Sequence, residues 1–139
     1  MRALAVLALL SSLICAPAFA VEHPAFLTGY WFGQGEPHDK TEMYLDHFLP
    51  NGEIHSQFRT CLKGKATDST EDGTWKVTGK TLVIKVVLHD GVPAPREDVY
   101  RLDLVTADRF KETYLKLNFP FDERRVPHDF KMPSCELVS

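Results

Sequence analysis

Apolar and polar residues alternate along much of the chain, and the alternation is clearest in residues 73–88, GTWKVTGKTLVIKVVL. Between residues 82 and 88 every second residue is apolar. This spacing has the period of two of a β-strand and not the 3.6 of a helix. With a turn centred on Gly79, it predicts a hairpin whose strands cover residues 74–77 and 81–89.

A second hairpin is predicted around residues 50–52, Pro-Asn-Gly. Proline presets φ for the first turn position, and Asn-Gly tolerates the left-handed region that follows. The flanking strands would cover residues 42–49 and 53–62, with residue 49 facing residue 53. This register pairs apolar side chains on one face, Phe48 with Ile54 and Tyr44 with Phe58.

Further alternating segments complete an up-and-down antiparallel meander of about eight strands. Closing the meander into a lipocalin-like barrel removes its exposed strand edges. Alternate connections of such a barrel lie at opposite ends, so short turns would close one end and four long loops would surround the other, where ligand contacts usually gather. The other strands are predicted at residues 27–32, 98–105, 110–117 and 129–132, and the loops include residues 63–72, 90–95 and 118–128.

Two Gly-x-Trp elements, Gly29-Tyr30-Trp31 and Gly73-Thr74-Trp75, lie in predicted strands. The second continues as Val-x-Gly-x-x-Leu in residues 77–82 and follows Leu-Pro-Asn-Gly-Glu in residues 49–53. The first resembles the signature near the start of lipocalins, and the whole pattern is similar to that of small exported bacterial lipocalin-like (calycin-type) proteins. The resemblance implies a single β-barrel domain over residues 21–139, with the first tryptophan closing one end.

Residues 1–20 have the features of a cleaved secretory signal peptide. Met1-Arg2 precede an apolar run over residues 3–15, and Ala18-Phe19-Ala20 has the small-x-small pattern that signal peptidase recognises. A membrane anchor is one alternative, but an apolar run of roughly 13 residues is shorter than the ~20 that span a bilayer. A lipoprotein signal at Cys15 is another. We expect a periplasmic or secreted protein with no transmembrane segment in its mature chain.

Charge and length narrow the class of protein further. The chain has 16 basic and 19 acidic residues and a formal net charge of −3. Its basic residues do not cluster as a nucleic-acid footprint requires, so we expect no nucleic-acid partner. The length after the signal is enough for one domain with one core, and we expect a monomer.

Two cysteines remain outside the predicted signal, Cys61 and Cys135. An even pair of cysteines in an exported protein usually forms a disulfide bond. Two buried free thiols are the alternative. A bridge between these residues would attach the C-terminal segment to the body of the domain.

Aromatic residues on the predicted inward face indicate a candidate site inside the barrel. Side chains of this kind could contact a small apolar or amphipathic ligand, although aromatics at period two can also simply fill a small barrel. The candidate ligand-binding residues are Trp31, Tyr44, Phe58 and Tyr100. Basic strand residues are expected to face water, because burying an unpaired charge costs several kcal/mol. They are Arg59, Lys85 and Arg101.

Three histidines, His38, His89 and His128, each precede an aspartate and fall at the predicted long-loop end. Imidazoles that converge from three loops can bind zinc or copper, so these residues form a candidate metal site. Solvated loop histidines are the alternative. His47 and His55 are predicted cross-strand neighbours, which could share a metal or repel each other when both are protonated.

No catalytic motif stands out, because no serine lies in a nucleophile-elbow context and acidic pairs such as Glu97-Asp98 are common in loops. The sequence therefore predicts a non-catalytic binding protein, without a cofactor, that holds a small apolar or amphipathic ligand at the long-loop end of the barrel. The alternative is a protein-interaction module, such as an inhibitor of a secreted or envelope hydrolase. Such a module would dock through proline-stiffened loops at residues 93–95 and 120–127.

Overall fold

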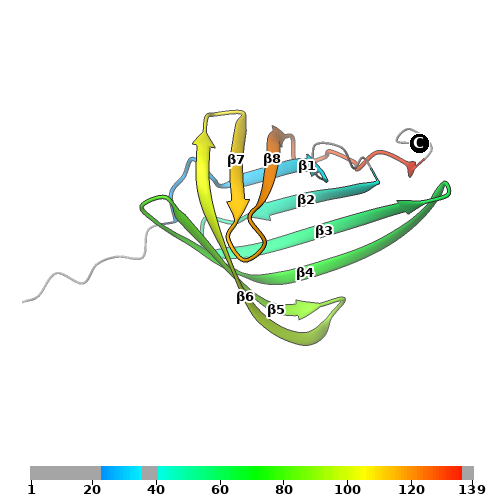
Figure 1. Ribbon diagram of the computed structural model, residues 1–139, viewed down its shortest axis with the longest axis horizontal. Helices are drawn as coiled ribbons and strands as arrows, with labels where there is room; N and C mark the ends of the chain where they lie inside the picture. The colour runs from blue at the N-terminus through cyan, green and yellow to red at the C-terminus, as the bar shows by residue number, and fades with distance from the viewer. Residues whose placement is uncertain (1–22, 36–40, 136–139) are drawn as a thin grey trace, which may run out of the picture.

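The computed structural model describes residues 23–35 and 41–135, so the predicted signal peptide and His38 lie outside the described residues. Its strands form a closed antiparallel barrel, in which each strand pairs with the next and the last pairs with the first (Figure 1). The predicted all-β, up-and-down barrel is confirmed. The strands are β1 (Gly29–Gln34), β2 (Glu42–Phe48), β3 (Glu53–Leu62), β4 (Lys65–Thr78), β5 (Thr81–His89), β6 (Val92–Val105), β7 (Arg109–Tyr114) and β8 (Phe119–Val126).

The β2–β3 hairpin has the predicted register. In its turn, the Asn51 side-chain oxygen accepts a hydrogen bond from the backbone N–H of Glu53 at 3.0 Å. Gly52 has a φ of 88°, a left-handed conformation that glycine adopts without strain. Strands β3 and β5 also have the predicted bounds. The cross-strand pairs are Phe48 with Ile54, Tyr44 with Phe58 and His47 with His55.

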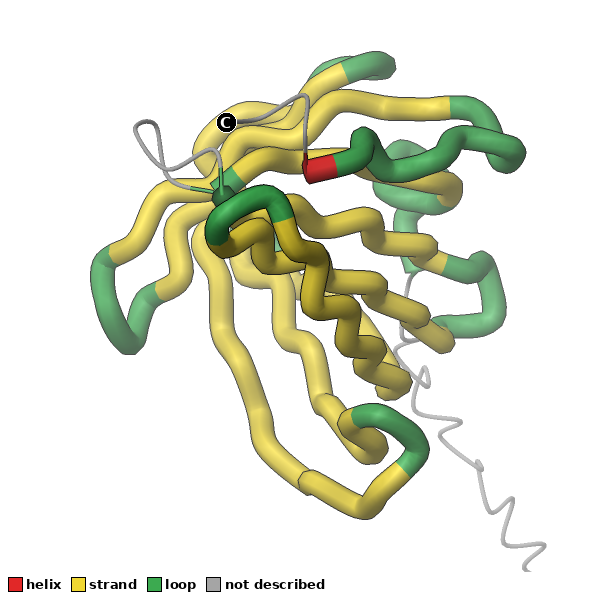
Figure 2. The backbone as a smooth tube through the Cα atoms, turned by 90° about the vertical axis from the view of Figure 1, so that its right-hand side faces the viewer, coloured by secondary structure: helices red, strands yellow, loops and turns green. Residues whose placement is uncertain are grey.

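Three segments predicted as long loops are instead strands joined by tight turns, and these predictions were wrong. Residues 63–72 belong mostly to β4, residues 90–95 begin β6, and residues 118–128 contain β8. The predicted strand at residues 129–132 is not a strand. The connections that replace these three loops are short, at residues 63–64, 90–91 and 115–118, and Figure 2 shows loops and turns in green between the yellow strands. The described barrel therefore has no end surrounded by four long loops. Turn residues with φ near 50° make these reversals possible: Lys63, Asp90 and Asn118.

The prolines that suggested loops lie where a strand has a single hydrogen-bonded neighbour. Pro93 and Pro95 lie in β6, which pairs with β7 only from Tyr100 onward. Pro120 lies in the part of β8 that pairs with β7 but not with β1. Proline cannot donate to a second ladder, and these positions do not require it to. The proline loops that a protein-interaction module would have used are therefore largely parts of β6 and β8.

An aromatic core closes one end of the barrel. Trp31 is fully buried and Trp75 nearly so, and the Trp31 indole N–H donates to the Leu27 carbonyl at 2.7 Å. The guanidinium of Arg125 lies 4.1 Å from the centre of the Trp31 ring and donates to the Thr28 carbonyl at 2.6 Å. The other buried members of this core are Leu27, Phe48, Ile54, Leu82, Leu102 and Phe110.

A second apolar cluster lies on the outer surface, where residues 127–135 run alongside β1 and β2 (Figure 1). Cys61 and Cys135 form the predicted disulfide bond, with their Cα atoms 5.3 Å apart. Arg59 supports the same segment by donating to the Pro133 carbonyl at 3.2 Å. The segment packs on a face made of Phe32, Met43, Leu45 and Val126. Among the described residues, no helix is long and apolar enough to cross a membrane.

Candidate functional site

Beyond the closed end, the barrel interior holds two adjoining cavities. The outer one has a volume of about 510 Å³ and the inner one about 120 Å³. Their walls share six residues, so the two cavities adjoin each other. The shared residues are Tyr44, Phe58, Arg96, Asp98, Tyr100 and Phe121.

Three of the four predicted ligand-binding residues line this space. Tyr44, Phe58 and Tyr100 come from β2, β3 and β6 and border both cavities. Trp31 lies instead in the closed end, where its ring meets that of Phe110 at 4.8 Å. Trp31 is not part of the cavity wall because it lies near the beginning of β1, within the core of the closed end.

The wall of the outer cavity is largely aromatic. The ring of Phe121 lies 5.6 Å from that of Tyr44 and 6.2 Å from that of Tyr100, in both cases edge to face. Tyr100 also meets Tyr114 at 5.2 Å. Aromatic rings held in these orientations offer apolar surface to a ligand at little cost in conformational entropy.

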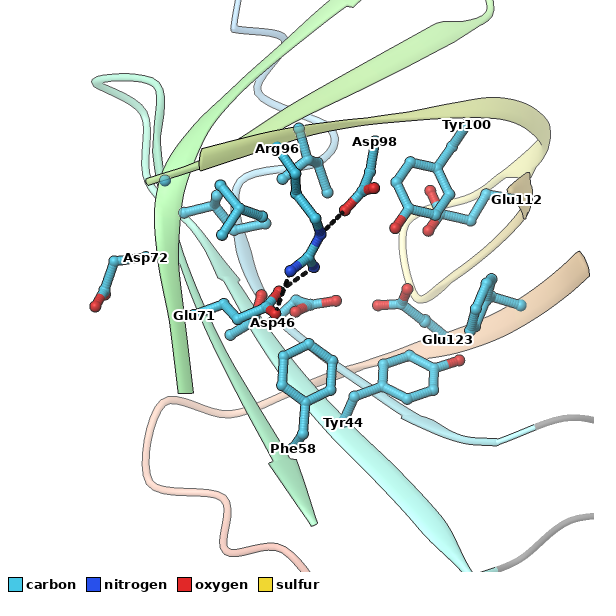
Figure 3. Close-up of a pocket in the computed structure, with 16 residues that line it drawn as sticks. Tyr44, Asp46, Phe58, Glu71, Asp72, Arg96, Asp98, Tyr100, Glu112 and Glu123 are labelled. Atoms are coloured by element: carbon cyan, nitrogen blue, oxygen red, sulfur yellow. Dashed lines mark hydrogen bonds and ion pairs between the residues drawn. The ribbon is translucent and has the colours of Figure 1, made fainter. Parts of the chain in front are cut away.

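Carboxyl side chains line the inner cavity (Figure 3). Asp46 of β2, Glu112 of β7 and Glu123 of β8 all border it, and Glu112 and Glu123 are only 5% and 1% exposed. Their position follows from strand periodicity, because Glu112 lies between the inward-facing Phe110 and Tyr114. These acids were not predicted from the sequence. What could have indicated them is their spacing of two residues from inward-facing aromatic residues, which places their side chains inside the barrel.

Arg96 is the cationic side chain of the inner cavity among the described residues. It donates to both carboxylate oxygens of Glu71, at 2.6 and 2.5 Å, and to Asp98 at 2.7 Å. Tyr114 also donates to Asp98, at 3.1 Å. Glu71 and Asp98 are thus compensated by one arginine. Glu71 escaped prediction because it lies in the segment 63–72 that was expected to be a loop, and Arg96 because it lies between the predicted loop at 90–95 and the predicted strand at 98–105.

Two buried carboxyl oxygens facing this space have no hydrogen-bond partner in the protein, Oε2 of Glu112 and Oε2 of Glu123. The Tyr44 hydroxyl, whose oxygen lies near the Asp122 backbone, donates no hydrogen bond within the protein. An unsatisfied buried polar group costs about 1–3 kcal/mol, and such groups are rare in folded proteins. A ligand with a polar end would supply the missing partner.

The electrostatics of the inner cavity favour protonated carboxyl groups. Burial first, and then repulsion from Asp46, raise the pKa of Glu112 and of Glu123 well above the usual range. Burial likewise raises the pKa of Asp46 to about 6, against the opposing effect of a hydrogen bond from Ser56. Burial and the charge of Glu123 raise the pKa of the Tyr44 hydroxyl. The protonated form of each glutamate is therefore favoured more strongly in the empty cavity than in water.

The three basic residues that were expected to face water all form ion pairs with acidic neighbours. None of them borders the inner cavity. Arg59 pairs with Asp68 at 2.7 Å. The other two pairs are Lys85 with Glu97 at 3.6 Å and Arg101 with Asp103 at 2.6 Å.

The candidate metal-binding histidines do not form a site within the described residues. His89 ends β5 and its Nδ1 lies 3.0 Å from Glu71, whereas His128 follows β8. His47 and His55 are neighbours with ring centres 6.3 Å apart, and His55 Nδ1 lies 2.5 Å from Asp72. The part of the chain that the structure describes contains no group of three or more His, Cys, Asp or Glu side chains placed to hold a metal ion.

A scan against protein-family models matched no family, and a search of curated proteins found no match. The geometry of the barrel interior is therefore the basis for a functional conclusion. It combines an aromatic entrance with a narrow, acidic inner end, an arrangement suited to enclosing a small molecule.

Proposed function

We propose that this protein is an exported, non-catalytic binding protein that holds a small amphipathic ligand inside the β-barrel. The observation that carries the proposal is a pair of adjoining cavities, an outer one of about 510 Å³ with several aromatic wall residues and an inner one of about 120 Å³. The apolar body of the ligand would contact Phe58, Tyr100 and Phe121. Its polar end would reach the atoms of Glu112 and Glu123 that lack a partner.

Export is part of the proposal and rests on two observations. Residues 1–20 have the pattern of a secretory signal, and the Cys61–Cys135 disulfide suits an oxidising compartment. The resemblance to small lipocalin-like proteins agrees with a binding role, because barrels of this size commonly enclose one small ligand.

The test is a fluorescence titration with N-phenyl-1-naphthylamine, an uncharged aromatic probe that brightens in apolar surroundings. We expect saturable binding of one probe per protein. Replacing Phe121→Ala should weaken binding about tenfold, since removing one aromatic wall forfeits roughly 1.5 kcal/mol of apolar contact.

Val87→Ala is the matched control, because Val87 is 52% exposed and lies outside both cavities. Its affinity should equal that of the wild type. Non-saturable binding, or binding that Phe121→Ala leaves unchanged while near-UV circular dichroism shows a native fold, would reject the proposed site.

A further inference from the structure

The inner cavity has more acidic side chains than its one cation can balance. Glu71 and Asp98 are held by Arg96, at distances of 2.5–2.7 Å. Asp72, which also borders the cavity, pairs with His55 at 2.5 Å. The remaining acids, Asp46, Glu112 and Glu123, have no cationic partner among the described residues. Buried carboxyl groups normally have a cation or several hydrogen-bond donors as partners.

The Tyr44 hydroxyl provides an independent observation at the same place. Tyr44 is 6% exposed, its hydroxyl donates no hydrogen bond within the protein, and it borders both cavities. Figure 3 shows Tyr44 beside Glu123, on the side of the cavity away from the ion pair of Arg96 with Glu71. An ionised carboxylate accepts hydrogen bonds and a tyrosine hydroxyl can both donate and accept, so these groups can receive hydrogen bonds from a donor on the ligand.

We infer that the ligand is an amphipathic organic cation, whose protonated amine contacts Glu112, Glu123 and the Tyr44 hydroxyl while its apolar or aromatic body fills the outer cavity. The inference rests on the proposed binding function and specifies the chemistry of the ligand. An ammonium group supplies up to three N–H donors and the missing positive charge. The surrounding rings of Tyr44, Phe58 and Phe121 add cation–π attraction when they face the charge.

Other classes of ligand fit the residues of the two cavities less well. A bare metal ion would leave the aromatic outer cavity without a function, and the described residues contain no metal-binding arrangement. An anion would add charge of the sign that is already in excess. A neutral alcohol could accept hydrogen bonds from protonated carboxyl groups, and the experiment below distinguishes it from an amine.

Binding of a cation would be coupled to loss of protons. The pKa values of Glu112 and Glu123 are raised in the empty cavity, so ionisation of either group is disfavoured there. A bound ammonium stabilises the ionised forms, so the protein would release protons as the amine binds. The affinity for an amine should therefore rise with pH, whereas the affinity for a neutral analogue should not.

The experiment measures displacement of N-phenyl-1-naphthylamine from the full-length mature protein by three matched indole compounds: tryptamine, its neutral analogue tryptophol, and indole-3-acetate. We expect tryptamine to bind at least about tenfold more tightly than tryptophol at pH 7.5, because a charge-assisted hydrogen bond is roughly twice as strong as a neutral one. Indole-3-acetate should bind most weakly. The preference for tryptamine should shrink between pH 7.5 and pH 5.

Glu123→Gln and, separately, Glu112→Gln keep the shape of the side chain and remove its charge. Each should weaken tryptamine binding about tenfold and change tryptophol binding less than about twofold. Glu97→Gln is the control, because Glu97 pairs with Lys85 at the surface and is 53% exposed. It should leave both affinities unchanged.

The outcomes separate the two proposals. If tryptophol or indole-3-acetate binds as tightly as tryptamine, or if the probe binds and none of the indole compounds displaces it, the inferred cation site is wrong and the proposed binding function stands. If the probe itself does not bind, the proposed function fails. The comparison of tryptamine with tryptophol needs only the wild-type protein, so a variant that does not fold leaves the inference testable.

Discussion

Glu123 is almost fully buried, and with Glu112 it lines a cavity inside the barrel that is also bordered by aromatic rings. Both side chains have a raised pKa in the folded protein because burial disfavours their charged form. A glutamate in the unfolded chain has a pKa of about 4.3. The folded barrel therefore binds protons at these two residues more tightly than the unfolded chain does.

This difference predicts the pH dependence of stability in the ligand-free protein. As pH rises above about 4, the unfolded chain loses its glutamate protons first, so the free energy of unfolding falls until the pH passes the raised pKa of the folded state. Glu123→Gln removes one such group. At pH 8 the variant should melt at least about 3 °C above the wild type, and at pH 4 the two should be close.

Differential scanning calorimetry at pH 4, 6 and 8 would measure this difference, with Glu97→Gln as the control for loss of one surface charge. A constant difference in Tm between Glu123→Gln and the wild type at all three pH values would contradict the prediction, since it would show that residue 123 carries the same charge in both states.

Among the elements, the C-terminal segment over residues 127–135 has no strand of its own and depends on side-chain contacts. It is held by Cys135, by the rings of Phe130 and Phe32 at 4.9 Å, and by hydrogen bonds from Arg59 to the carbonyls of Met132 and Pro133. The disulfide joins residues separated by 74 positions, so it also restricts a long loop in the unfolded chain.

Cys135→Ser should therefore lower the free energy of unfolding by about 2–4 kcal/mol and release this segment from the barrel. Urea denaturation would measure the first effect, and limited proteolysis would detect cleavage after Lys131. Reduction of the wild-type protein should reproduce both effects. A variant that keeps wild-type stability and resists proteolysis would mean that the apolar contacts alone hold the segment.

At the scale of the whole molecule, the buried aromatic core and the outer cavity lie at different ends of the barrel. The closed end contains the buried rings of Trp31, Trp75 and Phe110, and Trp31 is covered by Arg125. The open end contains half-buried rings around a cavity, among them Phe58. Removing a fully buried ring leaves a cavity in the core, whereas removing a half-exposed ring enlarges a space that already exists.

This arrangement predicts that one substitution mainly lowers stability and another mainly weakens probe binding. Trp31→Ala should lower the free energy of unfolding by about 3–5 kcal/mol but keep N-phenyl-1-naphthylamine binding in the fraction that is folded. Phe58→Ala should cost only about 1 kcal/mol of stability and weaken probe binding. Urea denaturation and probe titration on both variants would measure these effects, and equal losses of stability would contradict the assignment of the two ends.

The sequence alone was enough to predict the parts of the fold that depend on local chemistry. Pro-Asn-Gly at residues 50–52 and the alternation on both sides set the register of β2 and β3, because a turn and one apolar face permit few other pairings. The same reasoning located β5, and the pairing of Cys61 with Cys135 followed from their being an even pair.

Only the tertiary structure decided where the polar and proline-rich strands lie and what the barrel contains. Glu71 and Arg96 lie in the parts of β4 and β6 that precede the predicted strand segments and lack a continuous apolar face, so the periodicity there carried no signal. Asp46 and Glu123 are far apart in sequence, and they line one cavity because β8 closes the barrel next to β1. A local pattern records which way a side chain points, whereas the acidic interior depends on which strands the closed barrel brings face to face.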